Sequence, residues 1–319
     1  MDVVALGELL VDFTNNGISG QGNDMYEANP GGAPCNVLSF LQKMGYSTAF
    51  IGKVGKDSFG ELLKDAIKEQ GIETKGLLFD EKVPTTLAFV HTAPDGDRDF
   101  SFYRNPGADM MLCRREVNES LIQSAKIFHF GSLSMTSGQA EEATRYAIET
   151  AKKNGVFVSF DPNLRPPLWS DLKVAKEKIA YGLSRCDILK ISDNEVEFMT
   201  GEQDIEKGVQ KIIEQYHIPF VCATMGKDGS KAFYRNHIIT GEPFHSEKTI
   251  ETTGAGDTFC GSMLHFVLRY GMDGFTPEIL EELLSFANAA SCLITTRKGA
   301  LRVMPSKSEI EMFRKENGR

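Results

Sequence analysis

A short stretch near the C-terminal end of the chain combines glycines, threonines and one carboxylate directly before an apolar run. It reads TIETTGAGD over residues 249–257. Glycines such as Gly254 and Gly256 let the chain turn tightly and come close to a ligand. The N–H groups of Ala255, Gly256 and Asp257 would then point out of a helix start, where the helix dipole favours negative charge. The pattern predicts a site for charge that develops on a phosphoryl group during its transfer.

Asp257 places a negative charge inside this expected anion site. We expect the carboxylate to stay ionised, because the helix dipole and the N–H groups stabilise its charged form. An ionised carboxylate beside a phosphoryl group can accept a proton from an attacking hydroxyl. The alternative interpretation is an ordinary helix N-cap, a position at which aspartate is preferred.

The elements that must position these residues alternate between short β-rich runs and longer amphipathic runs. This alternation predicts a parallel sheet covered by helices on both faces, an α/β fold. Residues 85–103 predict a hairpin around a Pro-Asp-Gly turn. We expect one domain over residues 1–319, with a small β lid formed by about 13–29 and 85–105. The main strands are expected at 3–6, 48–54, 127–131, 156–161, 188–192 and 220–224, and the main helices at 33–44, 57–70, 138–154, 257–270 and 278–296.

Composition limits the classes of function. The chain has 319 residues and a net charge of −9, without a lysine or arginine block, which argues against nucleic acid as a partner. The six cysteines have no zinc spacing, the N-terminus has no signal-peptide pattern, and no uncharged run reaches the ~18 residues of a membrane helix. These features favour a cytoplasmic globular protein without a membrane partner.

Several motifs, in chain order, resemble those of the ribokinase-like (PfkB) carbohydrate kinases. ETTGAGDTFCGSM resembles the family's C-terminal signature, and PGGAPCNVLSFLQKMG followed by IGKVGKDSFGELL resembles a second one. The segments FSFYRNPGADMML and FDPNLRPPLW are most similar to those of fructokinases. The likeness runs from GELLVDF to RKGAL. It implies a three-layer α/β/α sandwich with a mainly parallel central sheet and a small β lid.

The resemblance also implies a role for individual residues. Asp257 would be the base, and the N–H groups of Gly254, Ala255 and Gly256 would form the anion hole. The sugar-side residues would be Asp12, Gly31, Gly32, Asn36, Arg104 and Arg165. The ATP-side residues would be Asn194, Thr224, Gly226, Lys227, Gly229, Asn288 and Gly299.

Each of these assignments has a plainer alternative. Asp12 can be a solvated turn residue, and the glycine pair an ordinary turn. Arg104 and Arg165 can form surface ion pairs. Asn194 and Glu197 also fit a helix-start pair, and Asn288 can be a satisfied amide on a helix face.

Two ions are implied. Asn194 and Glu197 would organise magnesium, largely through water, because Mg²⁺ keeps several waters. Many relatives also hold potassium beside the anion hole. Its ligands here would include Glu251 and carbonyls near Thr253 and residues 298–299. Glu251 replaces the family's usual aspartate, and its longer side chain can either coordinate the cation or fill the site.

We therefore expect an ATP-dependent sugar kinase, a fructokinase acting on O6 of D-fructose, that forms a homodimer through the lid. A 2-keto-3-deoxygluconate kinase is the alternative within the family, and its acidic substrate would require an extra cation. A phosphofructokinase would add lysine or arginine near residues 31–36. A non-catalytic sugar-binding regulatory protein is the alternative from another class, and the intact Asp257 argues against it.

Overall fold

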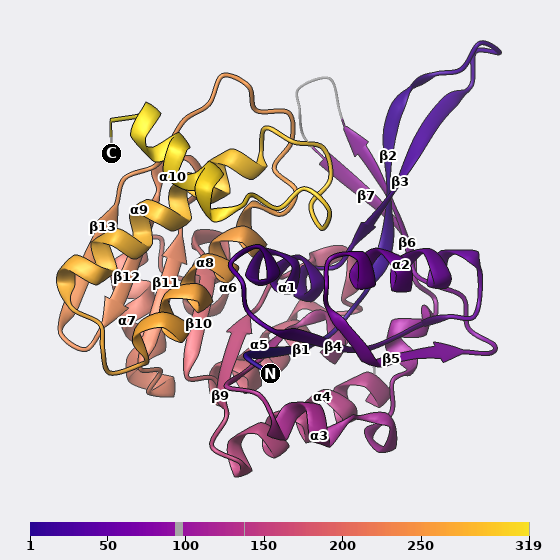
Figure 1. The fold of residues 1–319 in the computed structure, drawn as a ribbon. Helices are drawn as coiled ribbons and strands as arrows, with labels where there is room; N and C mark the ends of the chain where they lie inside the picture. The colour runs from indigo at the N-terminus through magenta and orange to yellow at the C-terminus, as the bar shows by residue number, and fades with distance from the viewer. Residues whose placement is uncertain (93–97, 137, 319) are drawn as a thin grey trace.

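The chain folds into a large sheet with helices on both faces and a smaller sheet beside it (Figure 1). This computed structural model describes residues 1–92, 98–136 and 138–318. The large sheet has the strand order β13-β12-β11-β10-β9-β8-β1-β4-β5. Neighbours from β11 to β5 are parallel, while β12 and β13 pair antiparallel at one edge. The strands are β1 (Val3–Leu6), β4 (Thr48–Gly55), β5 (Glu73–Asp80), β8 (Ile127–Gly131), β9 (Phe157–Asp161), β10 (Ile188–Ser192), β11 (Phe220–Thr224), β12 (Ser230–Tyr234) and β13 (His237–Gly241).

Successive side chains of the central strand β1 enter two separate cores, because a strand presents alternate residues to opposite faces. Val3 and Ala5 pack with α1 (Ala33–Lys43), α2 (Ser58–Glu69), α8 (Ala255–Tyr270), α9 (Pro277–Ile294) and α10 (Lys307–Glu316). Val4 and Leu6 pack with α3 (Glu119–Gln123), α4 (Gly138–Lys153), α5 (Leu172–Leu183), α6 (Asp193–Thr200) and α7 (Ile205–Tyr216). These two cores confirm the expected α/β layering. No helix in the described part of the chain is both long and apolar enough to cross a bilayer.

The helix boundaries follow their capping residues. The helix expected from residue 57 begins after Asp57, whose carboxylate accepts the N–H of Gly60. The helix expected from residue 257 begins two residues earlier, at Ala255. Its cap is Gly254, which has a left-handed φ of 79° that glycine adopts without strain.

The smaller sheet, here called the lid sheet, confirms the expected β layer. It consists of β3 (Asp24–Gly31), β2 (Leu10–Ile18), β6 (Leu87–Thr92) and β7 (Arg98–Tyr103), in that order. β6 and β7 pair antiparallel as the hairpin prediction requires, and its turn at residues 94–96 lies outside the described residues. The hairpin of β2 and β3 projects away from the body of the protein (Figure 1).

Aromatic rings hold the four lid strands together. Phe13 on β2 stacks on Phe89 of β6 at a centroid distance of 4.8 Å. Tyr26 of β3 and Tyr103 of β7 each place an edge against Phe89 at 5.5 Å. Phe13 also contacts Phe59 of α2 edge-on at 5.7 Å, which ties the lid sheet to the body of the protein. Such ring pairs contribute about 0.5–1.5 kcal/mol each beyond their burial.

A buried ion pair lies where the lid sheet meets the body. Arg104 follows β7 directly, and its Nη2 lies 2.6 Å from Oδ2 of Asp109, with both side chains almost fully buried. Thr86, just before β6, donates to Asp109 Oδ1 at 2.5 Å. Arg104 also donates to the Thr136 hydroxyl and to the carbonyl of Leu133 on the body side. Both ends of the β6–β7 hairpin are therefore fastened to one buried charge pair.

Candidate active site

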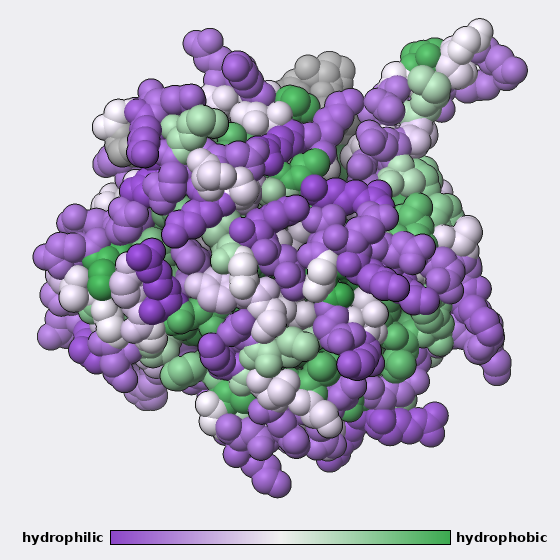
Figure 2. All heavy atoms as spheres, viewed as in Figure 1, coloured by the Kyte–Doolittle hydropathy of each residue, from purple (hydrophilic) through white to green (hydrophobic). Residues whose placement is uncertain are grey.

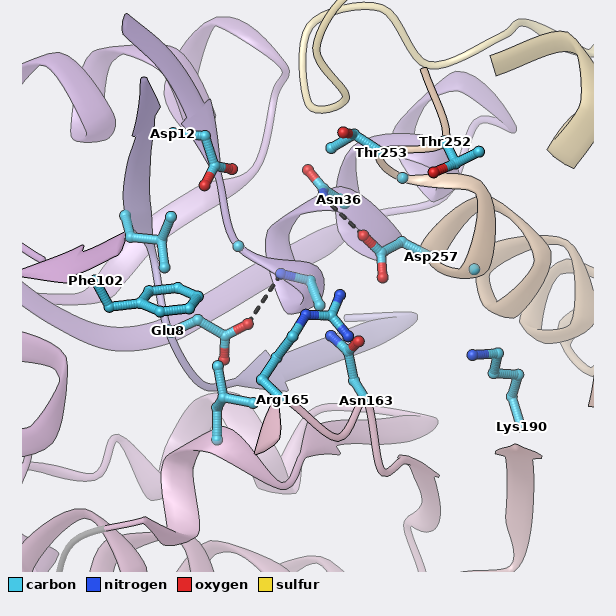
Figure 3. Close-up of a pocket in the computed structure, with 16 residues that line it drawn as sticks. Glu8, Asp12, Asn36, Phe102, Asn163, Arg165, Lys190, Thr252, Thr253 and Asp257 are labelled. Atoms are coloured by element: carbon cyan, nitrogen blue, oxygen red, sulfur yellow. Dashed lines mark hydrogen bonds between the residues drawn. The ribbon is translucent and has the colours of Figure 1, made fainter. Parts of the chain in front are cut away.

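A cavity of about 340 Å³ opens at the C-terminal ends of the parallel strands, where open α/β sheets usually bind ligands. We call it the acidic cavity, because Glu8, Asp12 and Asp257 line it (Figure 3). Its other wall residues come from the lid sheet, from the loops after β3, β8 and β9, from α1, from β10, and from the start of α8 with the segment that leads into it. They are Leu10, Gly32, Ala33, Asn36, Phe102, Leu133, Asn163, Arg165, Lys190, Thr252, Thr253, Gly254 and Gly256.

A second cavity of about 390 Å³, here called the neighbouring cavity, lies beside the first. Thr252 and Gly256 line both, so the two cavities meet at the start of α8. The structure brings five of the predicted ATP-side residues into its wall: Thr224, Gly226, Lys227, Gly229 and Asn288. Apolar side chains such as Phe244 and Phe259 complete a wall suited to a flat aromatic ring.

The start of α8 is shaped to receive negative charge. The first helical hydrogen bond runs from the N–H of Thr258 to the carbonyl of Gly254, at 2.8 Å. The N–H groups of Ala255, Gly256 and Asp257 therefore have no carbonyl partner inside the helix. Ala255 donates instead to the carbonyl of Thr252 over a long 3.3 Å. The junction of the two cavities is thus a helix N-terminus with donors directed at it.

Asp257 lies in the third position of α8 and points into the acidic cavity (Figure 3). It makes no capping bond, so the N-cap alternative is wrong. Its Oδ2 accepts a hydrogen bond from Asn36 Nδ2 at 2.8 Å. Burial raises the pKa of Asp257, while Asn36, Arg165 and Lys190 act in the opposite direction. The prediction that Asp257 stays ionised included the helix dipole and the N–H groups but not the effect of burial on the pKa. A raised pKa makes the carboxylate a better proton acceptor.

The hydrogen bond to Asp257 orients the Asn36 side chain, whose amide oxygen accepts no hydrogen bond from the described residues. The residue is 4% exposed, and its Oδ1 has no hydrogen-bond partner in the described structure. An unpaired buried amide oxygen costs about 1–3 kcal/mol. A hydroxyl donor in the acidic cavity would remove this cost, which agrees with the predicted sugar-side role.

Burial also disfavours the charged form of Asp12, a second carboxylate of the cavity. Burial raises the pKa of Asp12 to about 7; Arg165 opposes the shift, while Glu251 and Asp257 add to it. Gly31 is not a wall residue: a Cβ on it would lie 2.2 Å from Asp12 Oδ2, so it makes room for this carboxylate. Gly32, at φ 126°, does line the cavity as predicted.

The loop after β9 carries Asn163 and Arg165 into the cavity (Figure 3). Asn163 has a left-handed φ of 44°, which turns the chain sharply after the strand. Its N–H is held by Asp161 Oδ1 at 3.2 Å. Arg165 is exposed and is a wall residue, as predicted.

Lys190 is a wall residue that the sequence interpretation missed. Its Nζ lies 3.2 Å from Asp161 Oδ2, and a Cβ on Gly256 would come within 3.2 Å of it. The ammonium therefore lies against the start of α8. Burial lowers the pKa of Lys190, but Asp161 and Glu195 raise it more, so the group stays charged. A lysine inside the otherwise apolar strand ILKIS was the available signal.

Arg104 is the clearest wrong assignment. It was expected in the sugar pocket, but it is not a wall residue of either cavity and is fully used by Asp109, Thr136 and Leu133. The surface ion-pair alternative is also wrong, because the pair is buried. The β7 residue that lines the acidic cavity is Phe102, two positions earlier.

Two other assignments are changed by the structure. Asn288 lines the neighbouring cavity, but its amide is used by Ser230, Gly241 and Glu242, as the satisfied-amide alternative expects. Gly299 lies outside the described wall of that cavity and donates its N–H to Glu251 at 2.8 Å.

Only some of the predicted ion ligands line the two cavities. Asn194 and Glu197 are exposed at the start of α6 and line neither cavity in the described residues. Thr253 is a wall residue of the acidic cavity. No cluster of three or more His, Cys, Asp or Glu side chains in the described chain could hold a metal.

Comparison with known proteins gives consistent matches over the whole chain. The model of the pfkB family carbohydrate kinases matches residues 1–307. Fructokinase-2 of Oryza sativa subsp. japonica is 40% identical over 307 residues, which cover 95% of this chain and 91% of that protein. The crystal structure of a Xylella fastidiosa fructokinase with bound ATP superposes with a TM-score of 0.90 at 29% identity, covering 100% and 99% of the two chains. A Vibrio cholerae O395 fructokinase double mutant with bound fructose, ADP and potassium gives 0.88 at 30% identity, covering 98% of each chain.

The buried carboxylates predict how stability depends on pH. The pKa of Asp12 is about 7 when folded and about 4 when unfolded, so the folded protein binds the extra proton between these values. Its contribution to stability is present below about pH 4 and is lost as the pH rises to 7. Asp12→Asn removes this loss. We expect the variant to gain about 1 kcal/mol, or roughly 2 °C, relative to wild type between pH 5 and pH 7.5, a figure reduced because Asp12 is only half-buried.

Thermal unfolding of the ligand-free protein at the two pH values measures this gain. Asp24→Asn, at an exposed position on the same hairpin, is the matched control. An Asp12→Asn difference that is the same at both pH values would contradict the prediction.

Proposed function

The chain belongs to the pfkB family of carbohydrate kinases, and we propose that it transfers the γ-phosphoryl group of ATP to the O6 hydroxyl of D-fructose. The observation that carries the proposal is the meeting of the two cavities at the start of α8, with Asp257 on the side of the acidic cavity. The sugar would occupy the acidic cavity and ATP the neighbouring cavity. Fructokinases at 40% sequence identity, and one crystallised with fructose and ADP, support fructose as the substrate.

The transfer step follows from the positions of these groups. Asp257 takes the proton of the O6 hydroxyl, O6 bonds to the γ-phosphorus, and the bond from that phosphorus to the oxygen it shares with the β-phosphate breaks. ADP leaves with the electron pair of that bond. The N–H groups at the start of α8 and the Lys190 ammonium face the charge that develops on the transferred group.

Magnesium would accompany ATP. Asn194 and Glu197 supply an amide and a carboxylate oxygen at the exposed start of α6, a donor set that suits an ion which keeps most of its waters. When bound, the ion neutralises phosphate charge. For potassium, the bond from the Gly299 N–H to Glu251 Oε1 supports the interpretation in which glutamate itself fills part of the site.

The charge of the acidic cavity argues against a sugar acid. Three carboxylates line it, and the cations in its described wall are Arg165 and Lys190. Lys190 is paired with Asp161 and lies against the start of α8, where the phosphoryl group would be transferred, which leaves Arg165 as the cation available to a charged group on the sugar. A carboxylate or phosphate on the sugar would therefore meet net negative charge, so a neutral ketose is favoured over 2-keto-3-deoxygluconate or a sugar phosphate.

A coupled assay of ADP release tests the function. The wild-type protein is supplied with MgATP and either D-fructose, D-glucose, D-ribose or 2-keto-3-deoxygluconate, with and without potassium. We expect the highest kcat/KM with fructose. Higher kcat/KM with the keto-acid would assign the alternative, and no turnover with any sugar would favour the regulatory protein.

Asp257→Asn is predicted to lower kcat by about 10²–10⁴, because the amide cannot accept the O6 proton. Binding should persist, since Asn36 and the other wall residues are unchanged. The measurement is kcat together with fructose and ATP binding by calorimetry. Asp273→Asn, at a side chain 98% exposed, is the control and should leave kcat unchanged. Full activity of Asp257→Asn would remove the base assignment.

Lys190→Met is predicted to lower kcat by about 10²–10³, because it removes the ammonium that faces the negative charge developing on the phosphoryl group. This variant also leaves Asp161 buried without its partner, so the double variant Lys190→Met/Asp161→Asn is measured beside it. If the double variant stays inactive, Lys190 acts on the phosphoryl group. If the double variant recovers wild-type kcat, Lys190 serves only to neutralise Asp161.

We also propose that two copies associate through their lid sheets. The β2–β3 hairpin projects from the body and carries green, apolar spheres among purple, polar ones (Figure 2). Ile18 and Met25 on this hairpin are exposed, and Tyr103 is 66% exposed on the edge strand β7. Sedimentation velocity should give twice the 35.3 kDa chain mass. Ile18→Lys/Met25→Lys should shift the protein to the monomer, and a monomeric wild type would contradict the proposal.

A further inference from the structure

Glu8 is a buried carboxylate of the acidic cavity to which the proposed reaction gives no role. It lies in the connection between β1 and β2, is 5% exposed and lines the cavity together with Phe102 and Leu133. Among the described residues it forms no ion pair. A carboxylate kept in such surroundings requires an explanation, because burying an unpaired charge is costly.

One oxygen of Glu8 has a structural task. Oε1 accepts the N–H of Ala33, the first residue of α1, at 3.0 Å. The neighbouring backbone is packed closely, since a Cβ on Gly32 would lie 2.4 Å from the carbonyl oxygen of Glu8. The side chain is therefore held in one place, with its carboxyl group at the cavity wall (Figure 3).

The structural task does not explain the negative charge. A glutamine could accept the N–H of Ala33 equally well without a charge to bury. Burial is the main cause that raises the pKa of Glu8 to about 7; Asp109 adds to the shift, while backbone hydrogen bonds and Arg104 oppose it. The charge is therefore destabilising in the empty protein. It becomes favourable once hydrogen-bond donors enter the cavity, because a carboxylate can accept from two hydroxyls.

The position of Glu8 indicates which part of a sugar would meet it. In Figure 3, Glu8 lies on the far side of the cavity from Lys190 and the start of α8, while Asp12 lies above it. The reacting O6 must lie beside Asp257. The substituents on C2 of a fructofuranose, O2 and the C1 hydroxymethyl group, are on the ring carbon across the ring oxygen from C5 and C6.

We propose that Glu8 binds a hydroxyl on C1 or C2 of the ketose and so helps to select ketoses. The proposal rests on the proposed function, because it uses O6 transfer to orient the sugar. It makes Glu8 a substrate-binding residue with a second, structural contact to Ala33, and it assigns the C2 end of the sugar to the β1–β2 connection.

A cycle of enzyme and substrate changes tests this proposal. Wild type and Glu8→Gln are compared on D-fructose, on 1-deoxy-D-fructose, which lacks O1, and on 2,5-anhydro-D-mannitol, which lacks O2. We expect Glu8→Gln to lower kcat/KM for fructose about 10- to 100-fold, mainly through KM for the sugar, with the KM for ATP within about twofold. The loss should fall to about threefold or less on the analogue that lacks the hydroxyl bound by Glu8.

An equal loss on all three sugars would overturn the proposal and leave Glu8 with its structural role only. Glu8→Gln retains an acceptor for Ala33 and removes a buried charge, so its melting temperature should not fall below that of wild type. Glu8→Met, which loses that acceptor too, measures the structural contribution by itself. Failure of wild type to phosphorylate fructose would instead refute the proposed function. Fructose binding to wild type and Glu8→Gln, measured by calorimetry without ATP, then tests Glu8 independently: unchanged affinity in the variant overturns its role.

Discussion

The start of α8 has to hold a carboxylate and receive an anion within three residues. The surrounding residues fix the turn in the conformation that this requires. Gly254 turns the chain where an added Cβ would lie 2.8 Å from Cβ of Ala300. The hydroxyl of Thr258 bonds back to the Gly254 carbonyl, and Ser291 of α9 donates to the carbonyl of Ala255. The turn is thus fixed from both sides. Donors held in place beforehand need no reorganisation when charge develops.

The same constraint explains why the lid is fastened so firmly at its base. The Arg104–Asp109 pair joins both ends of the β6–β7 hairpin to the carbonyl of Leu133, a wall residue of the acidic cavity. Phe102 lies two residues from this pair and faces the same cavity. A buried pair of this kind is weak evidence for stability, but it fixes direction and register well. It sets where the lid residues stand relative to the cavity wall.

Periodicity was sufficient to predict six strands of the large sheet, its main helices and the lid hairpin, because strand and helix patterns are local. Strands β5, β12 and β13, at or next to the edges of that sheet, were not predicted. Asp257 was also predictable, since the glycine turn and the helix start are contiguous in sequence. Arg104 and Lys190 show where this fails. Both are cations next to carboxylates that lie 5 and 29 residues away in the chain, and their partners decide their roles. Arg104 lies outside the cavity wall because Asp109 is buried beside it. Lys190 lines the cavity because β10 carries it against the start of α8. Neither contact can be predicted from the hydrophobic pattern of the neighbouring residues.

The buried carboxylates of the acidic cavity are electrostatically unfavourable until donors pair with them, and this is consistent with a site that binds polyols. Glu8 and Asp12 have raised pKa values because burial removes water that the carboxylates need. A sugar brings several hydroxyl donors at fixed spacing, and it can replace this water while adding no charge. An acidic sugar would bring the same hydroxyls but also a like charge. The destabilised carboxylates therefore favour neutral polyols through the same interaction that lowers the stability of the ligand-free protein.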